Sequence, residues 1–175
     1  NMDTDLGIDI FDVAERHARL KKREENKIRP KLKLLADNLR GGFFSKELYA
    51  YMGEPGKGKS IFLANDALQA LMDGNNVVYV SFELSEEMFA VRVDQNLMQK
   101  EMYDVVNNVM AVKERYESLK GITTGKLMIK EYPTGGASAL DLERYLELLR
   151  IYKNFEADIL FIDYGDIMKP INGNS

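Results

Sequence analysis

One octapeptide constrains this chain more than any other feature, because it matches the pattern G-x-x-x-x-G-K-[ST]. It consists of Gly53, Glu54, Pro55, Gly56, Lys57, Gly58, Lys59 and Ser60. Glycines in such a loop let successive backbone N–H groups point inward as an anion site, and the N-terminus of a following helix adds a positive potential. Lys59 would then reach the β- and γ-phosphates of a nucleoside triphosphate, and the Ser60 hydroxyl would bind Mg²⁺.

The elements predicted on either side of this loop are the ones its chemistry requires. Residues 48–52 are apolar and β-rich, which predicts a strand, and residues 61–72 have the periodicity of a helix. A glycine-rich turn that matches the pattern by chance would rarely stand between two such elements. We therefore expect a nucleotide-binding loop.

A carboxylate that can hold Mg²⁺ through water is predicted at Asp163. It directly follows the apolar run at residues 159–162, at the carboxyl end of a buried strand, and so matches the Walker B pattern. Open α/β sheets bind ligands at this end of their strands. The simpler alternative is an aspartate that caps a turn, and Asp166 is a weaker second candidate for the metal.

A candidate general base is Glu83, which directly follows the apolar run at residues 77–82. Hydrolysis needs a group that orients and deprotonates the attacking water, and a carboxylate at the end of a strand can do this. The alternative is a favourable charge near a helix N-terminus, and we assign that role to Glu86 and Glu87.

Strands and helices are predicted to alternate beyond the loop, which indicates βαβ units on a parallel sheet. Further strands are expected at residues 77–82, 126–131 and 159–162. Further helices are expected from the cap Ser85 to about residue 100, over 105–120 as far as Gly121, and from the cap Ser138 to about residue 154. The chain stops soon after a central strand, so we expect a fragment of a longer protein, truncated on its C-terminal side.

The first part of the chain is predicted to be helical. Residues 8–26 have an amphipathic pattern with a charged tail, and a shorter helix is expected over 31–39 before the turn at Gly41 and Gly42. We assign residues 1–38 to a helical linker and 39–175 to the nucleotide-binding domain. The apolar stripe of the first helix could pack on its own domain or on another subunit, and the sequence leaves both open.

Composition excludes several kinds of site. The chain has no cysteine, and the single His17 cannot form a zinc centre alone. No run approaches the roughly 18 apolar residues of a membrane span, so we expect a cytoplasmic protein with no membrane contact. The net charge of -4 has the wrong sign for a surface covered with nucleic-acid contacts, so any such contact must be local or lie outside this chain.

Three segments in this order resemble the motor domain of DnaB-type replicative helicases. They are the loop at residues 53–60, VYVSFELSEEM at residues 78–88 and IDY at residues 162–164. The resemblance spans about residues 38–169, and KEYPTGGA at 130–137 with KNF at 153–155 is similar to the helicases of T-even-type phages. Where DnaB-type enzymes often have IDYLQ, this chain has IDYGD, so a role of that glutamine does not carry over.

The resemblance implies a RecA-like P-loop core with a parallel central sheet flanked by helices and preceded by the helical linker. It further implies a homo-hexamer, fuelled by ATP or GTP with Mg²⁺, that encircles single-stranded DNA and unwinds forked DNA, with primase and a helicase loader as possible partners. Lys59, Ser60, Glu83 and Asp163 carry over. In a RecA-type core the strand before Glu83 is expected beside the strand before the loop. The family's DNA-binding loops, sensor strand and arginine finger are expected outside this chain.

Several alternatives stay open. A recombinase-like or clock-protein-like ATPase would share these motifs without unwinding DNA, and a non-enzymatic module would bind nucleotide only to stabilise an assembly. The segment at residues 132–136 could face the interior of a ring, but a turn before the helix capped by Ser138 is the simpler interpretation. Arg92 and Arg144 are expected to be surface or packing residues. Hydrolysis is expected to need an intact ring, so this chain alone should be weakly active.

Overall fold

The computed structural model describes residues 7–54, 56–164 and 168–170. The chain forms two compact units, residues 1–51 and residues 52–175. Within these described ranges, the first unit holds two helices, and the second holds the sheet with the helices that cover it.

The first unit begins with helix α1 (Val13–Glu25), which starts later than the predicted range 8–26. Its start is fixed by the Asp12 carboxylate, which accepts a 2.9 Å hydrogen bond from the backbone N–H of Glu15. The second predicted helix is present as α2 (Lys33–Asn38). An antiparallel bridge between Ile28 and Phe43 then joins the chain before α2 to the chain after it.

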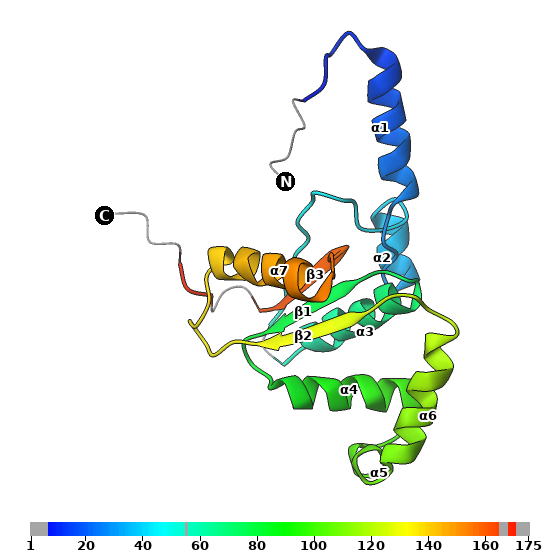
Figure 1. Ribbon diagram of the computed structural model, residues 1–175, viewed down its shortest axis with the longest axis vertical. Coiled ribbons are helices and arrows are strands. Elements are labelled where there is room, and N and C mark those ends of the chain that lie inside the picture. Colours follow the sequence, from blue (N-terminus) through cyan, green and yellow to red (C-terminus); the bar gives the residue numbers. More distant parts are fainter. Residues whose placement is uncertain (1–6, 55, 165–167, 171–175) are drawn as a thin grey trace. The chain divides into compact units, whose positions relative to one another are not determined.

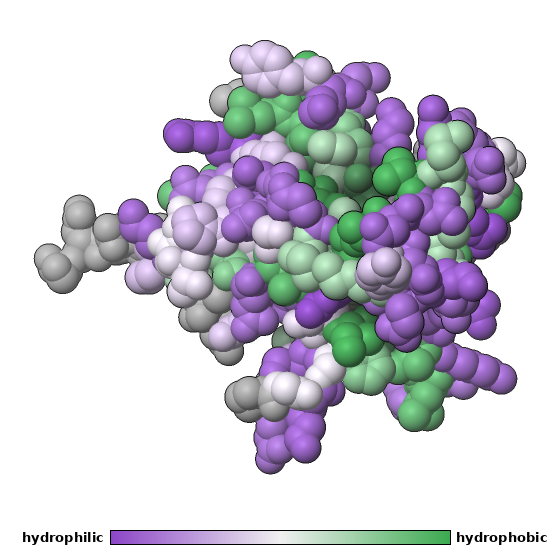
Figure 2. Space-filling view, turned by 90° about the horizontal axis from the view of Figure 1, so that it is seen from below, coloured by the Kyte–Doolittle hydropathy of each residue, from purple (hydrophilic) through white to green (hydrophobic). Residues whose placement is uncertain are grey.

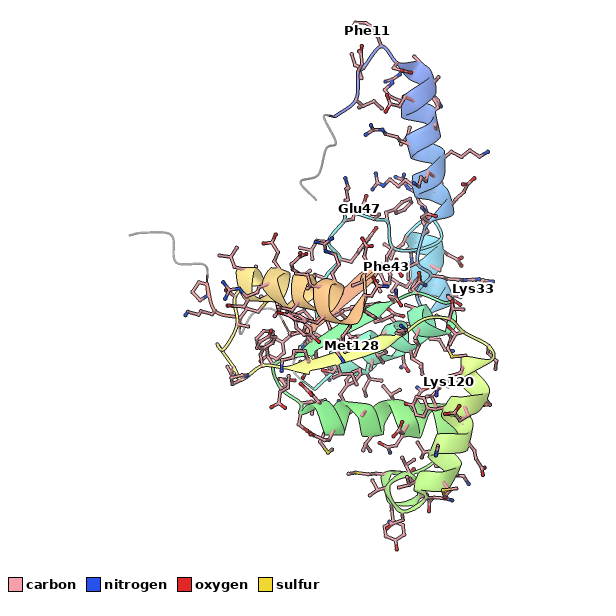
Figure 3. The ribbon with its side chains drawn as sticks, in the orientation of Figure 1. Phe11, Lys33, Phe43, Glu47, Lys120 and Met128 are labelled. Carbon is pink, nitrogen blue, oxygen red and sulfur yellow. The ribbon has the colours of Figure 1, made fainter. Side chains whose placement is uncertain are left out.

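The C-terminal end of α1 is held by the segment that follows α2. Arg23 forms an ion pair with Glu47, and its guanidinium lies 5.0 Å from the centre of the Phe44 ring. The Phe43 ring packs against Tyr49 at a centroid distance of 5.0 Å, and Figure 3 labels Phe43 and Glu47 on this segment. The contacts of α1 with this segment are therefore made by Arg23, near the C-terminal end of the helix, and none of the residues of α1 is buried.

The predicted strand at residues 48–52 is wrong, because this segment forms neither strand nor helix in the structure. The side chains of Leu48 and Met52 are 94% and 92% exposed. A β-rich sequence becomes a strand only when a neighbouring strand accepts and donates its backbone hydrogen bonds. No strand in the described part of the chain pairs with this segment.

Among its described residues, the second unit has three parallel strands, β1 (Val77–Ser81), β2 (Leu127–Glu131) and β3 (Ile159–Asp163), in the order β2-β1-β3 (Figure 1). Since β1 is flanked by β2 and β3, the expectation that it neighbours the strand before the loop is also wrong. All five residues of β1 are buried, as expected for the centre of a parallel sheet.

Helices cover both faces of this sheet (Figure 1). On one face lies α7 (Ala139–Lys153), and the other carries α3 (Lys59–Met72) and α4 (Glu86–Met98). Val78 and Val80 belong to the apolar cluster that includes Leu142 and Leu149 of α7. Alternate residues of β1 point to the other face, so the sheet has a core on each side.

The helix predicted over residues 105–120 is in fact two helices, α5 (Met102–Asn107) and α6 (Val109–Lys120). The Asn108 side chain accepts a 3.2 Å hydrogen bond from the backbone N–H of Ala111. Asparagine side chains compete with the helical backbone for its hydrogen bonds, so Asn108 ends one helix and caps the next. The end of α6 at Gly121 is as predicted.

Apolar side chains are exposed on α5 and at the start of α6. They are Met102, Tyr103, Val106, Val109 and Met110. Figure 2, viewed from the side on which α5 lies in Figure 1, shows hydrophobic residues at the surface between hydrophilic ones. None of the helices in the described ranges is both long and apolar enough to cross a membrane.

Candidate nucleotide-binding site

The glycine-rich loop leads directly into α3. Gly56 and Gly58 have φ angles of 74° and 84°, in the left-handed region that residues with a Cβ rarely adopt. Gly58 caps the helix, and its carbonyl oxygen accepts 3.0 Å bonds from the N–H groups of Ile61 and Phe62. The conformation explains why the chain has glycine at these two positions, of which the pattern itself fixes Gly58, while Pro55 lies outside the described residues.

The two lysines of the loop differ in direction. The Lys59 ammonium group donates to the carbonyl oxygens of Gly53 (2.9 Å) and Glu54 (3.1 Å), so it lies across the loop. The Lys57 side chain is 68% exposed and lies 3.9 Å from the Glu54 carboxylate. Of the two cations, Lys59 is therefore the one held against the loop backbone.

The structure brings Ser60 and Asp163 together. The Ser60 hydroxyl donates a 2.9 Å hydrogen bond to Oδ1 of Asp163, and the Tyr79 hydroxyl donates a 2.9 Å bond to Oδ2. Asp163 is only 1% exposed. Both carboxylate oxygens are thus bound by hydroxyl donors in a buried position, while Asp166, the weaker candidate, lies outside the described residues.

Strand register explains why Asp163 lies at this point. Ser81, the last residue of β1, is paired with Asp163, the last residue of β3. The N–H of Phe82 donates a 2.8 Å bond to the Asp163 carbonyl oxygen, which extends the ladder by one residue. The carboxyl ends of two parallel strands therefore present Asp163 and the turn after β1 at the same edge of the sheet.

Tyr79 is fully buried between aromatic rings. Its ring lies 3.8 Å from that of Phe89 in α4 and 6.4 Å from that of Phe161 in β3, measured between centroids. Burial raises the pKa of the Tyr79 hydroxyl far above its ordinary value, and the charge of Asp163 and the hydrogen bond to it raise the pKa further. The hydroxyl therefore keeps its proton and acts as a donor to Asp163.

Glu83 lies in the turn between β1 and α4, with its side chain exposed. The Ser81 hydroxyl oxygen accepts hydrogen bonds from the N–H groups of Leu84 (2.8 Å) and Glu83 (3.3 Å), which fixes this turn. The negative charge of Glu83 also raises the pKa of the Tyr79 hydroxyl, although less than burial and Asp163 do. Glu83 therefore lies in the same region of the unit as Tyr79. Among the described residues, Glu83 forms no hydrogen bond or ion pair with the loop.

The glutamates that follow Glu83 are engaged at the start of α4. Ser85 caps this helix as predicted, since its hydroxyl oxygen accepts a 3.2 Å bond from the N–H of Met88. Glu86 accepts hydrogen bonds from the Glu131 backbone N–H (3.1 Å) and from the Lys130 ammonium group (3.4 Å). Glu86 therefore ties α4 to the end of β2.

The segment at residues 132–136 forms a turn. The Gly136 N–H donates a 2.7 Å bond to the Pro133 carbonyl oxygen, and α7 then begins after its cap Ser138, as predicted. The side chains of Arg92 on α4 and Arg144 on α7 are exposed, and neither forms an ion pair in the described part of the chain.

The donor set at the end of β3 fits Mg²⁺. A hydroxyl and one carboxylate are hard oxygen ligands, and Mg²⁺ commonly uses one or two carboxylates together with water and substrate phosphates. Within the described ranges, no group of three or more His, Cys, Asp or Glu side chains could hold a metal ion. Ser60 and Asp163 therefore suit a cation that arrives with a nucleotide better than a metal held by protein alone.

Comparison with known proteins identifies the family of this chain. The family model of the KaiC ATPases matches residues 28–125, more than half of the chain, and the chain belongs to this family. The predicted fold class, a RecA-like P-loop core with a parallel sheet flanked by helices, is confirmed.

A more particular similarity covers almost the whole chain. It is 31% identical over 173 residues to the DnaB-like replicative helicase of Enterobacteria phage T4. The alignment covers 97% of this chain but 36% of that helicase, so the chain spans about a third of the length of this relative. The predicted resemblance to DnaB-type phage helicases is confirmed.

Two residues of the site were not predicted from the sequence. Tyr79 and Ser81 lie in the apolar run at residues 77–82, and only their hydroxyl groups distinguish them from core residues. A tyrosine hydroxyl in a fully buried strand needs a hydrogen-bond partner, and that need is the signal that could have singled out Tyr79.

Proposed function

We propose that this chain is the nucleotide-hydrolysing motor part of a hexameric replicative DNA helicase, which moves along single-stranded DNA and unwinds the duplex. The observation that carries the proposal is the similarity to the phage T4 replicative helicase over 97% of the chain. This similarity continues past residue 125, where the match to the KaiC family ends. The contact between Ser60 and Asp163 supports a nucleotide site in the same region.

Each site residue has one role in this proposal. The loop of residues 53–60 binds the phosphates of ATP or GTP, with Lys59 at the β- and γ-phosphates. Ser60, and Asp163 through water, hold Mg²⁺, which neutralises the charge that develops on the phosphates. Glu83 orients the attacking water and accepts its proton.

The transition state also needs a positive charge near the γ-phosphate, and we propose that an arginine of a neighbouring subunit supplies it. Arg92 and Arg144 lie on α4 and α7, and neither is assigned this role. Hydrolysis then depends on the ring, so this chain alone should bind nucleotide but hydrolyse it slowly. Rapid hydrolysis by dilute monomer would contradict the need for a neighbour.

Residues 1–38 are proposed to be the linker that docks on an adjacent subunit of the ring. No residue of α1 is buried, and the apolar side chains of Ile10, Val13 and Leu20 are more than half exposed. An apolar stripe of this kind is stabilised when a partner covers it. DNA, a primase and a helicase loader are proposed to bind mainly through regions beyond this chain, consistent with its net charge of -4.

A second candidate function is a DNA-dependent ATPase that does not unwind DNA. The match of residues 28–125 to the KaiC ATPases favours this candidate, because it covers both the loop and Glu83. The two functions share the chemistry of hydrolysis and differ only in translocation.

The test is unwinding of forked DNA by the complete protein that contains this chain, with MgATP and with MgGTP. Wild type is compared with Glu83→Gln and with the control Glu87→Gln, which removes a nearby exposed carboxylate. We expect Glu83→Gln to abolish unwinding and slow hydrolysis by roughly 10²- to 10⁴-fold while nucleotide binding is kept. DNA-stimulated hydrolysis without unwinding by wild type would favour the second candidate.

A further inference from the structure

The carboxylate of Asp163 is fixed from two sides. Ser60 donates to Oδ1 and Tyr79 donates to Oδ2, each at 2.9 Å. Rotation of a carboxylate about its terminal bond has only broad preferences, so the rotamer alone does not set the plane of this group. The two hydroxyl groups together set this plane, because each of them binds a different oxygen of the carboxylate.

Tyr79 has the rigidity that this task requires. It is 0% exposed in the central strand, and its ring is packed against Phe89 and Phe161. A phenylalanine ring would fill the same apolar space, so packing alone does not explain a hydroxyl here. The hydroxyl has a specific partner in Asp163 and occupies the oxygen that Ser60 does not bind.

We propose that Tyr79 is a positioning residue for the magnesium site, which holds Oδ2 of Asp163 so that Oδ1 stays beside the Ser60 hydroxyl. This inference rests on the proposed function, because it takes Ser60 and Asp163 as the residues that hold Mg²⁺. Tyr79 touches neither nucleotide nor metal in this role. It acts through Asp163, as outer partners of metal ligands commonly do.

The chain offers a matched control for loss of a tyrosine hydroxyl. Tyr116 on α6 donates a 2.6 Å hydrogen bond to Oδ1 of Asp94 on α4, and this pair is remote in sequence from the loop. Tyr79→Phe and Tyr116→Phe each remove one hydroxyl donor from a carboxylate. Only the first change affects the carboxylate that contacts Ser60.

The experiment measures binding of a fluorescent ATP analogue to the 175-residue chain over a range of Mg²⁺ concentrations and in EDTA. For Tyr79→Phe we expect the Mg²⁺ concentration at half-maximal binding to rise about tenfold or more. Binding in EDTA should stay within about twofold of wild type, since the lost hydroxyl bonds Asp163, which is not a residue of the loop. Tyr116→Phe should match wild type in both conditions.

The outcomes separate this inference from the proposed function. If wild type binds nucleotide in a Mg²⁺-dependent way and Tyr79→Phe has the same Mg²⁺ dependence, the role of Tyr79 is refuted and the site stands. If wild type shows no Mg²⁺-dependent binding, the site is refuted and the role of Tyr79 with it.

Circular dichroism checks that Tyr79→Phe is folded. Should it fail to fold, 3-fluorotyrosine at position 79 keeps the ring and the hydroxyl but makes the hydroxyl a stronger donor. The inference then expects a changed Mg²⁺ concentration at half-maximal binding, and an unchanged one refutes it.

Discussion

The Ser60 hydroxyl lies 2.9 Å from Oδ1 of Asp163, although the two residues are 103 positions apart in the chain. The first turn of α3, which directly follows the glycine-rich loop, therefore meets the last residue of β3. The segment before the loop, by contrast, is paired with no strand in the described part of the chain. The loop is anchored through the helix that follows it.

Asp163→Asn should remove the Mg²⁺ dependence of nucleotide binding. The amide has nearly the same shape but no negative charge, so it cannot attract the cation. We expect affinity in Mg²⁺ to fall at least about tenfold, with affinity in EDTA unchanged. Titration with a fluorescent nucleotide measures both, and Asp94→Asn, which alters the carboxylate beside Tyr116, is the control. Equal losses in the two variants would argue against a metal site at Asp163.

Lys59→Ala should weaken nucleotide binding whether or not Mg²⁺ is present. A charge-assisted hydrogen bond contributes about 1.5–3 kcal/mol, which corresponds to roughly 10- to 100-fold in affinity. The control is Lys57→Ala, because Lys57 belongs to the same loop but is 68% exposed, and it should change affinity by less than about twofold. If Lys57→Ala weakened nucleotide binding more than Lys59→Ala, Lys57 and not Lys59 would be the phosphate-binding lysine.

The order of helices and strands could be predicted because most elements carry their own local signals. Ser85 and Ser138 are recognisable caps, and the apolar run that includes β1 is typical of a strand buried on both faces. The predicted strand at residues 48–52 failed because strand pairing depends on a partner, and the sequence of the segment does not specify one. The break at Asn108 was missed because a single side-chain hydrogen bond outweighs the helical pattern around it.

The site was predictable where its chemistry follows a fixed spacing. Lys59 and Ser60 belong to a motif, and Asp163 follows a strand, so local patterns identify them. Tyr79 acts through a residue 84 positions away, and only the register between β1 and β3 brings the two together. That register is a property of the sheet and cannot be read from either strand alone.

Ser81→Ala should disturb the turn that carries Glu83. The buried hydroxyl oxygen accepts bonds from the N–H groups of Leu84 and Glu83, and its removal leaves these donors without that acceptor. We expect a loss of about 1–2 kcal/mol in the free energy of unfolding. In the complete protein, the hydrolysis rate should fall more than nucleotide affinity.

Urea unfolding and steady-state hydrolysis measure these two effects. Ser118→Ala is the control, since the Ser118 hydroxyl is exposed and donates a 2.7 Å bond to the Arg115 carbonyl oxygen of its own helix. A Ser81→Ala variant that is less stable but hydrolyses nucleotide at the wild-type rate would show that the turn is not needed to place Glu83.

Stability should fall at acid pH partly through the N-terminus of α7. The Asp141 carboxylate accepts a 2.8 Å bond from the backbone N–H of Ser138 and a 2.7 Å bond from its hydroxyl, and these bonds lower the pKa of Asp141. Because the pKa is lower in the folded than in the unfolded chain, the contribution is complete above the unfolded pKa of about 4 and is lost as pH falls through the folded pKa. The Asp141→Asn variant should therefore lose less free energy of unfolding than wild type when the pH falls from about 5 to about 3. Glu143→Gln changes a carboxylate on the same helix but outside the cap, and this variant should lose as much free energy of unfolding as wild type over the same pH range. If both variants reduce this loss equally, the cap is not the source of the pH dependence.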